Sequence, residues 1–139
     1  MLVLNPQHVT FGESRWDHVQ VVAIDRAAHR DAVEWSDLGP HVAFADVPEQ
    51  RITVKVIREV SSDDVDSPKP GETNTLTFHT SPTASDGLRM KITMQAVVMR
   101  VEHDVSVRKG AVRTITLTAV SPDGATDPVV VTQSQGGDV

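Results

Sequence analysis

The stretch from Gly87 to Gly110, GLRMKITMQAVVMRVEHDVSVRKG, alternates apolar and polar residues as a β-strand does, but its apolar face changes partway along. Its first half has apolar side chains at even positions, up to Val98, and its second half has them at odd positions, from Met99 onward. Because strand side chains alternate between the two faces of a sheet, this ribbon must bury first one face and then the other.

The length of the ribbon limits how it can fold. A strand over residues 88–108 would extend about 65 Å at ~3.3 Å per residue, whereas a compact domain of this size has a diameter of only about 37 Å. The ribbon therefore either bends sharply, with a β-bulge near residues 97–99 that shifts the alternation by one residue, or projects in part and packs against another chain. The pattern alone favours neither alternative.

Period-two alternation dominates the rest of the chain, and no segment of helical length carries an amphipathic stripe. The sequence predicts one all-β domain over residues 1–139, with at most one short helix, built as a β-barrel or a two-sheet sandwich. Further strands are expected at 7–12, 16–24, 51–60, 73–80, 111–120 and 129–132. Residues 31–44 are expected to form a strand, a turn and a strand around Gly39-Pro40, or a helical turn in their first half. Residues 133–139 form a polar tail that we expect to be loose.

The composition excludes several kinds of site. The chain has no cysteine, so it has neither disulfides nor thiolate zinc sites. Its formal net charge of −6 argues against a protein that grips nucleic acid by neutralising phosphates. Aromatic residues make up 4% of the chain, without tyrosine, which disfavours stacking platforms for bases or sugars. The aromatic residues are expected in the core or in subunit contacts, and they are Phe11, Trp16, Trp35, Phe44 and Phe78.

No motif for catalysis, cofactor binding or metal binding is found. The six histidines lack zinc-site spacing, and the chain has no nucleophile elbow, phosphate-binding loop or dinucleotide motif. The loop SSDDVDSPKPGE, residues 61–72, is acidic, but Val65 and Pro68 interrupt the ligand spacing of a calcium loop, which favours a solvated loop. A hydrolase would need two carboxylates about 5 to 10 Å apart in a cleft. We expect no catalytic residue, no cofactor and no metal.

Membrane spanning is also not expected. No apolar run approaches 18 residues, and the N-terminal MLVLNPQH is too short for the apolar region of a signal peptide. The sequence predicts a chain that is soluble and cytoplasmic when synthesised. A small acidic β-domain with a ribbon longer than its own globule is expected to work by assembly, with its strand edges paired across subunits of a closed ring.

The order of these features resembles the tail tube proteins of long-tailed phages and of phage-derived gene transfer agents. The resemblance spans roughly residues 6–124. It rests on the segments VTFGESRWDHVQVVAIDR, FADVPEQRITVKVIREV, SSDDVDSPKPGE, LTFHTSPTASDGLRMKITMQAVVMRVEHDVSV and GAVRTITLTAVSPDG.

The resemblance implies a β-barrel or sandwich, flanked by a short helix, whose subunits form hexameric rings that stack into a tube. The inner sheets would merge into a lumen wall, commonly acidic, through which DNA passes without sequence-specific binding. A long loop or hairpin would reach the next ring. The partners implied are further copies of the chain and other tail proteins, namely the terminator, the distal tail protein and the tape measure. The chain would reside in the virion after assembly in the host cytoplasm.

The resemblance also implies particular interface residues. The 61–72 loop takes the place of an extended arm between subunits or rings, which makes Asp63, Asp64, Asp66 and Lys69 interface candidates. In the ribbon, Val98, Met99 and Val101 are candidates for contacts with a neighbour. Polar faces of the ribbon are expected to carry Arg89, Lys91, Gln95, Arg100 and Glu102, where the positive charges either pair with acids or face away from the lumen.

Two other functions remain open. The first is a distal tail, baseplate-hub or head-tail joining protein, which would form one ring and no tube. The second is a stand-alone β-sandwich that binds carbohydrate or protein.

Overall fold

The computed structural model describes residues 2–61, 68–80, 88–106 and 110–135. Within these residues nine strands form one sheet, and every strand pair is antiparallel. The strands are β1 (Leu2–Leu4), β2 (Gln7–Phe11), β3 (Ser14–Arg15), β4 (Val19–Trp35), β5 (Val42–Val60), β6 (Thr73–His79), β7 (Leu88–Ser106), β8 (Gly110–Ala119) and β9 (Val130–Gln135). The predicted all-β class is confirmed.

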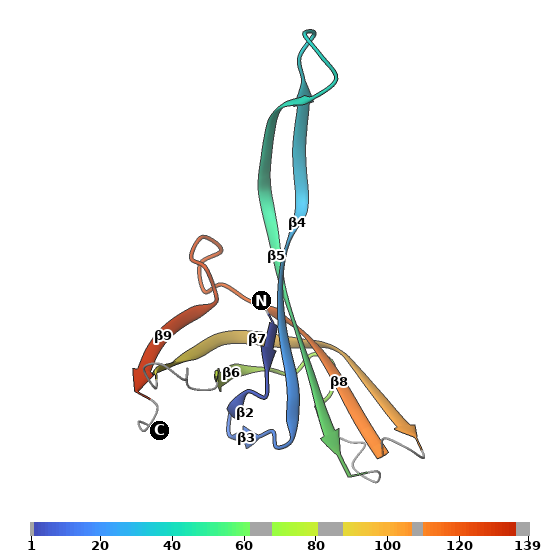
Figure 1. Ribbon diagram of the computed structural model, residues 1–139, viewed down its shortest axis with the longest axis vertical. Helices are drawn as coiled ribbons and strands as arrows, with labels where there is room; N and C mark the ends of the chain where they lie inside the picture. The colour runs from blue at the N-terminus through green and yellow to red at the C-terminus, as the bar shows by residue number, and fades with distance from the viewer. Residues whose placement is uncertain (1, 62–67, 81–87, 107–109, 136–139) are drawn as a thin grey trace.

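The sheet curls into a half-barrel, with a long hairpin rising from one side (Figure 1). Its strand order is β1-β4-β5-β8-β7-β6-β2-β3, and β9 pairs with the first part of β7. In the sequence, Lys109-Gly110 lies between two alternating runs, which predicts a hairpin. This hairpin is confirmed, because β7 and β8 pair from Ala96↔Ala119 to Ser106↔Gly110. The half-barrel is here called the body, and the long hairpin projects from it (Figure 1).

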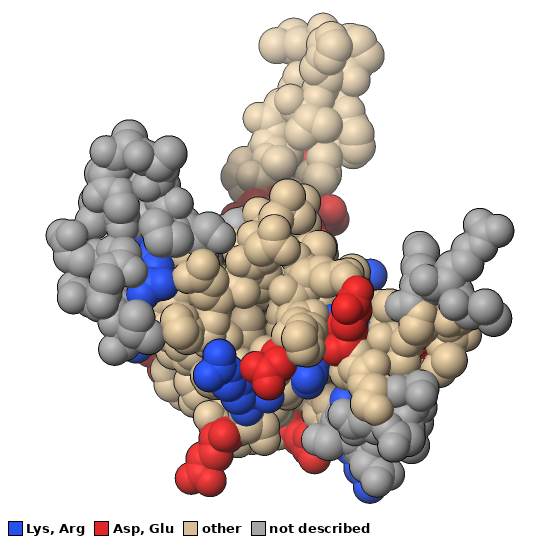
Figure 2. All heavy atoms as spheres, turned by 60° about the horizontal axis from the view of Figure 1, so that its bottom comes forward, with Lys and Arg blue, Asp and Glu red and all other residues tan. Residues whose placement is uncertain are grey.

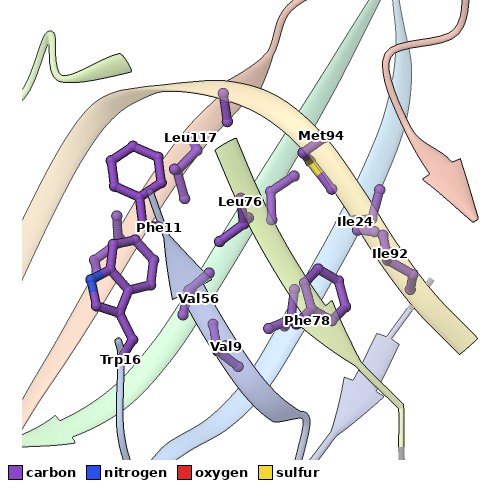
Figure 3. Close-up of a cluster of buried hydrophobic side chains, with 14 of the residues drawn as sticks. Val9, Phe11, Trp16, Ile24, Val56, Leu76, Phe78, Ile92, Met94 and Leu117 are labelled. Atoms are coloured by element: carbon purple, nitrogen blue, oxygen red, sulfur yellow. The ribbon is translucent and has the colours of Figure 1, made fainter. Parts of the chain in front are cut away.

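The hydrophobic core fills the concave side of the curled sheet (Figure 3). Alternation places Val54, Leu117 and Val98 side by side on β5, β8 and β7, each at most 1% exposed. On the other wall Phe11 stacks on Trp16, with ring centroids 5.1 Å apart. Burial of each such side chain stabilises the fold by roughly 1.5–3 kcal/mol, which makes this cluster the main source of stability.

Strand β7 contains the predicted bulge. Its register with β8 passes from Val98↔Leu117 to Arg100↔Thr116, so Met99 is the extra residue. Val98 is 1% exposed, and the next two residues, Met99 and Arg100, are both exposed, as expected when one inserted residue shifts the alternation. The ribbon therefore bends within the sheet, and the alternative in which it projects is wrong for the described part of β7.

The element that projects is the hairpin formed by β4 and β5 (Figure 1). The two strands pair from Val19↔Arg58 to Trp35↔Val42, and residues 36–41 connect them. The predicted strand, turn and strand around Gly39-Pro40 is confirmed, and the alternative of a helical turn there is wrong. Each strand of the hairpin satisfies the backbone groups that face its partner, and water is left to satisfy the groups that face outward.

Three further expectations need correction. The described residues contain no helix, so the short flanking helix implied by the resemblance is not found there. The expected loose tail is wrong for residues 133–135, which pair with β7 as part of β9, because backbone pairing needs no apolar side chain; residues 136–139 lie outside the described residues. Arg89 is 4% exposed rather than on a polar face, since it lies against β2 and donates a hydrogen bond from Nη1 to Gln7 Oε1 at 2.8 Å.

Candidate assembly surface

The outer part of the β4–β5 hairpin, residues 27–50, is here called the arm. Every residue from Asp25 to Arg51 is exposed, although both strands are regularly paired. A two-stranded hairpin with nothing packed on it is only marginally stable in water. An arm of this kind would be stabilised by packing against the surface of another molecule.

The side chains of the arm include many large apolar groups. Leu38 at the tip is 96% exposed, Trp35 61% and Phe44 52%. Val33, Val42 and Val47 are also exposed. Clusters of exposed apolar residues on a soluble chain are typical of contact surfaces, which distinguishes the arm from a solvated loop.

Both faces of the arm carry apolar groups. Residues paired directly across antiparallel strands project to the same side, so Trp35 and Val42 share a face, and Val33 lies two residues along on that face. Phe44 pairs with Glu34 and therefore projects from the opposite face. A partner that covers one face would leave the other exposed, so the arm is suited to insertion between two surfaces.

The charges on the arm divide it into two parts. The distal part, residues 31–46, contains Asp31, Glu34, Asp37 and Asp46 and has neither lysine nor arginine. Nearer the body, Arg30 Nη1 lies 3.5 Å from Glu49 Oε1, so the basic charge is paired within the arm. The tip therefore presents acidic and apolar groups together.

The base of the arm is tied to the connection between β8 and β9. Arg26 Nη2 lies 3.1 Å from Asp127 Oδ2. Hydrogen bonds from the Val129 backbone and then from Arg26 lower the pKa of Asp127. This exposed ion pair contributes at most about 1 kcal/mol, but it fixes where the arm leaves the body.

The same connection is organised by Asp123. Its Oδ1 accepts hydrogen bonds from the backbone N–H groups of Ala125 (2.9 Å) and Thr126 (2.8 Å), and its Oδ2 accepts one from the Thr126 hydroxyl at 2.9 Å. These bonds to the charged form, first those from Thr126 and Ala125, lower the pKa of Asp123. Asp123 thus has a structural role in the loop beside the arm.

Two histidines meet where β2 pairs with the end of β6. The His8 and His79 rings meet edge to face with centroids 5.6 Å apart. Burial lowers the pKa of His79, and the positive charge of Arg89 lowers it further. His79 is therefore a neutral, partly buried histidine. Among the described residues, no three His, Asp or Glu side chains lie close enough together to hold a metal ion.

The residues predicted as interface candidates are widely separated in the structure. Asp63, Asp64 and Asp66 lie outside the described residues. Lys69 is exposed in the turn before β6, where its carbonyl accepts a hydrogen bond from Glu72 N at 3.2 Å. Val98 is a core residue, 1% exposed, Val101 packs against the same core, and Met99 points outward. Of the four candidates that the structure describes, only Lys69 and Met99 thus offer a largely exposed side chain to a partner.

The polar positions expected on β7 are found at its surface, apart from Arg89. Lys91, Gln95, Arg100 and Glu102 are exposed. Arg100 Nε lies 2.9 Å from Glu102 Oε1, two residues along the same face. The positive charge at Arg100 is therefore paired within its own strand.

The arm itself was not predicted from the sequence. Residues 25–30, DRAAHR, contain no apolar alternation, so two shorter strands were expected where β4 is continuous. Alternation reports burial of one face, and the arm buries neither face in the single chain. The available signal was the Gly39-Pro40 turn flanked by Trp35 and Phe44, which marks a hairpin with large apolar groups on both strands.

Comparison with known proteins gives no match: no protein-family model fits the chain, and no curated protein is significantly similar to it. No helix in the described part of the chain could cross a membrane.

Proposed function

We propose that the chain is the subunit of a tail tube, in which hexameric rings stack into a conduit for DNA in a phage or gene transfer agent particle. The sequence resemblance supplies the family. The arm is the observation that carries the proposal, because a paired but unburied hairpin with apolar groups on both faces needs a partner surface. The arm takes the role that the resemblance assigns to the 61–72 loop, contact with a neighbouring subunit or ring.

The ends of the sheet support lateral assembly. Among the described strands, β1 and β3 stand at the two ends of the strand order, each with a partner on one side only. In β1 the side chains of Leu2 and Leu4 are 63% and 61% exposed. Open apolar edges promote uncontrolled association, and a closed ring in which neighbours cover them removes that hazard.

The charge of the chain is compatible with a conduit for DNA. A wall that carries net negative charge repels a polyanion, which therefore slides without being held. The chain has 19 acidic residues against 13 lysines and arginines. Non-enzymatic transport of this kind requires no catalytic residue, cofactor or metal.

Electron microscopy of the purified protein tests the proposal. A tail tube subunit is expected to form rings and tubes with a hollow lumen at high protein concentration. Rings that never stack would favour a distal tail, baseplate-hub or head-tail joining protein. A chain that stays monomeric with its tail partners added, and that binds a glycan or a protein, would favour the stand-alone binding module.

A further inference from the structure

The end of the molecule opposite the arm contains a polar hollow of about 350 Å³. Its size is at the lower end of the range for ligand pockets, roughly 300–1,000 Å³. Its polar side chains come from the turns around β1, β2, β3 and β4, and they are Asn5, Gln7, His8, Arg15, Asp17 and His18. Trp16 and Val9, both buried in the core, form its apolar floor. The hollow is therefore a rigid, polar recess backed by the hydrophobic core.

The backbone around this hollow is strained. In the described residues, three positions other than glycine have positive φ, namely Asn5 (50°), His8 (53°) and His18 (58°), and all three line the hollow. Each such residue costs of order 1–3 kcal/mol, and such positions cluster where a site needs a particular shape. The strain therefore marks this hollow as a shaped site rather than an incidental gap.

Backbone hydrogen bonds hold the strained positions in place. Asn5 N donates to Gln20 O at 2.9 Å, and Glu59 N donates to His18 O at 3.1 Å. Trp16 N donates to Val9 O at 2.9 Å across the middle of the recess. The recess is thus formed before any partner arrives, which lowers the entropic cost of binding.

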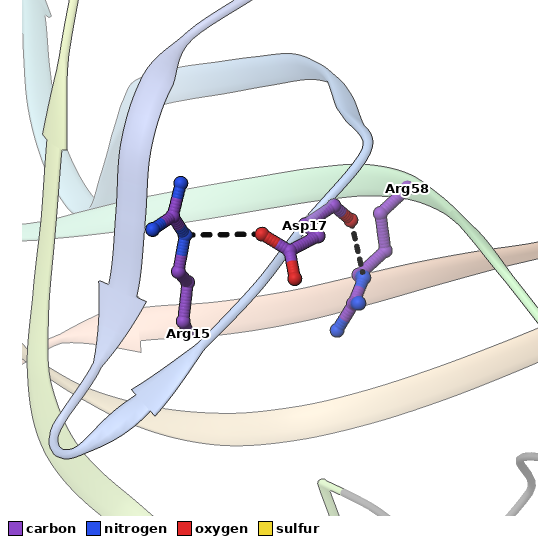
Figure 4. Close-up of polar contacts among 3 residues, drawn as sticks. All are labelled: Arg15, Asp17 and Arg58. Carbon is purple, nitrogen blue, oxygen red and sulfur yellow. Dashed lines mark hydrogen bonds and ion pairs between the residues drawn. The ribbon is translucent and has the colours of Figure 1, made fainter.

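The rim of the hollow carries basic groups (Figure 4). Arg15 Nε lies 3.0 Å from Asp17 Oδ1, and Arg58 Nε donates a hydrogen bond to the Asp17 backbone oxygen at 3.1 Å. His8 and His18 add imidazole groups that can donate hydrogen bonds. Two guanidinium groups, those of Arg15 and Arg58, thus lie beside one acidic side chain, Asp17, so this group of charges is positive by one and suits a ligand with a carboxylate group.

The positions of the hollow and the arm suggest the ligand. The strands that form the hollow lie at the lower end of the molecule, and the arm tip lies at the upper end (Figure 1). Figure 2 looks onto the lower end and shows lysine and arginine side chains beside acidic ones, with the arm rising behind. Two complementary sites at opposite ends of one chain join copies head to tail, and such a contact propagates as a filament.

We infer that the hollow at Asn5, His8, Arg15 and His18 is the receptor for the arm tip of a second copy of this chain. The inference rests on the proposed function and specifies the contact between stacked rings. Asp37 at the tip faces the basic rim, and Leu38, 96% exposed in the single chain, reaches the apolar floor. Opposite charges thus select the docking partner, and the burial of Leu38 adds affinity.

The larger apolar hollow of about 460 Å³ does not fit this role. It is lined by Thr126, Asp127 and Val130, so it lies at the connection that Arg26 ties to the base of the arm. A tip docked there would join two copies side by side at the arm bases, and the basic group beside this hollow, Arg26, is already paired with Asp127. The basic recess at the far end is the better match in both position and charge.

Charge exchange between two full-length variants tests the contact. Arg15→Asp alone and Asp37→Arg alone each place like charges at the contact, and each is expected to raise the protein concentration needed for tubes by about 10-fold or more. An equimolar mixture should restore tubes, because each variant supplies the charge that the other lacks. Light scattering and electron microscopy measure the tubes, and circular dichroism checks that each variant is folded.

The control exchange uses Arg100, an exposed arginine on β7 paired with Glu102. Arg100→Asp alone keeps both Asp37 and Arg15, so it should form tubes at the wild-type concentration, and adding Asp37→Arg to it should not bring the Asp37→Arg chains into the tubes. If the wild type forms tubes and Arg15→Asp forms them equally well, the docking site is wrong while the tail tube proposal stands. If the wild type never assembles, both proposals fail.

Glycine variants test the hollow without the risk of unfolding. Glycine adopts positive φ without strain, so His8→Gly with His18→Gly should keep the backbone while removing both imidazoles. The expected result is a folded chain whose tubes need about 10-fold more protein. Tubes at the wild-type concentration would overturn the role given to these histidines.

Discussion

Val98 and Met99, at the β7 bulge, differ in burial, so substitutions at these two positions test the register of β7. Val98 is buried on the same side as Leu117, and Met99, the extra residue, points outward. Arg100, the next residue, is exposed as well, and this break in the alternation comes from the one inserted residue, because strand side chains otherwise change sides at every position.

Val98→Asp should unfold the subunit, since an unpaired buried carboxylate costs about 3–5 kcal/mol. Met99→Asp should change the free energy of unfolding by less than about 0.5 kcal/mol, because the site is exposed. Thermal denaturation of the monomer measures both. Equal destabilisation by the two substitutions would contradict the register described for β7. Reduced assembly by folded Met99→Asp would support the interface role predicted for that residue.

Asp123 provides a pH test at a single carboxylate. Its pKa is lowered in the folded state, so its contribution to stability is complete above the unfolded value of about 3.8 and is lost as pH falls below that value. Asp123→Ala should therefore lower the melting temperature at pH 7, and the difference from wild type should shrink below pH 4. A difference that is constant from pH 7 to pH 2 would show that charge at Asp123 does not stabilise the loop.

At the scale of elements, the β4–β5 hairpin has two regions with different stability. Near the body β5 is held by β8 as well as β4, and Val54 and Val56 fill the core. In the arm each strand pairs, among the described residues, only with the opposite strand of the same hairpin. This pairing has several register shifts, and Pro48 lies between two of the paired positions. Proline lacks the N–H group of a regular ladder, which fits such an irregularity.

Trp35→Asp should separate the role of the arm from that of the fold. Trp35 is 61% exposed, so the free energy of unfolding of the monomer should change by less than about 1 kcal/mol. Loss of this large apolar side chain should prevent assembly, which sedimentation velocity detects. Val54→Asp serves as the core control and should unfold the monomer. Normal assembly of Trp35→Asp would show that the arm is not an essential contact.

For the whole molecule, the arm determines the shape. Ten steps of about 3.3 Å carry the arm roughly 33 Å from Asp25 to Trp35, almost the diameter of a compact domain of this size. Small-angle X-ray scattering of the dilute monomer should give a maximum dimension near 70 Å and a radius of gyration well above ~14 Å. A radius of gyration near 14 Å would mean that the arm folds back on the sheet in solution.

The sequence by itself determined the β-class and the β7–β8 hairpin, and it offered a bulge at residues 97–99 as one of two alternatives, between which the structure decided. Each of these depends on local alternation, which records which side chains are buried. It did not determine the arm, because a hairpin exposed on both faces has no alternation, and it did not reveal the burial of Arg89. Only the tertiary structure brought Asn5, Arg15 and His18 into one recess and placed that recess opposite the arm. Such convergence depends on strand order and sheet curvature, which arise from contacts between residues far apart in the chain.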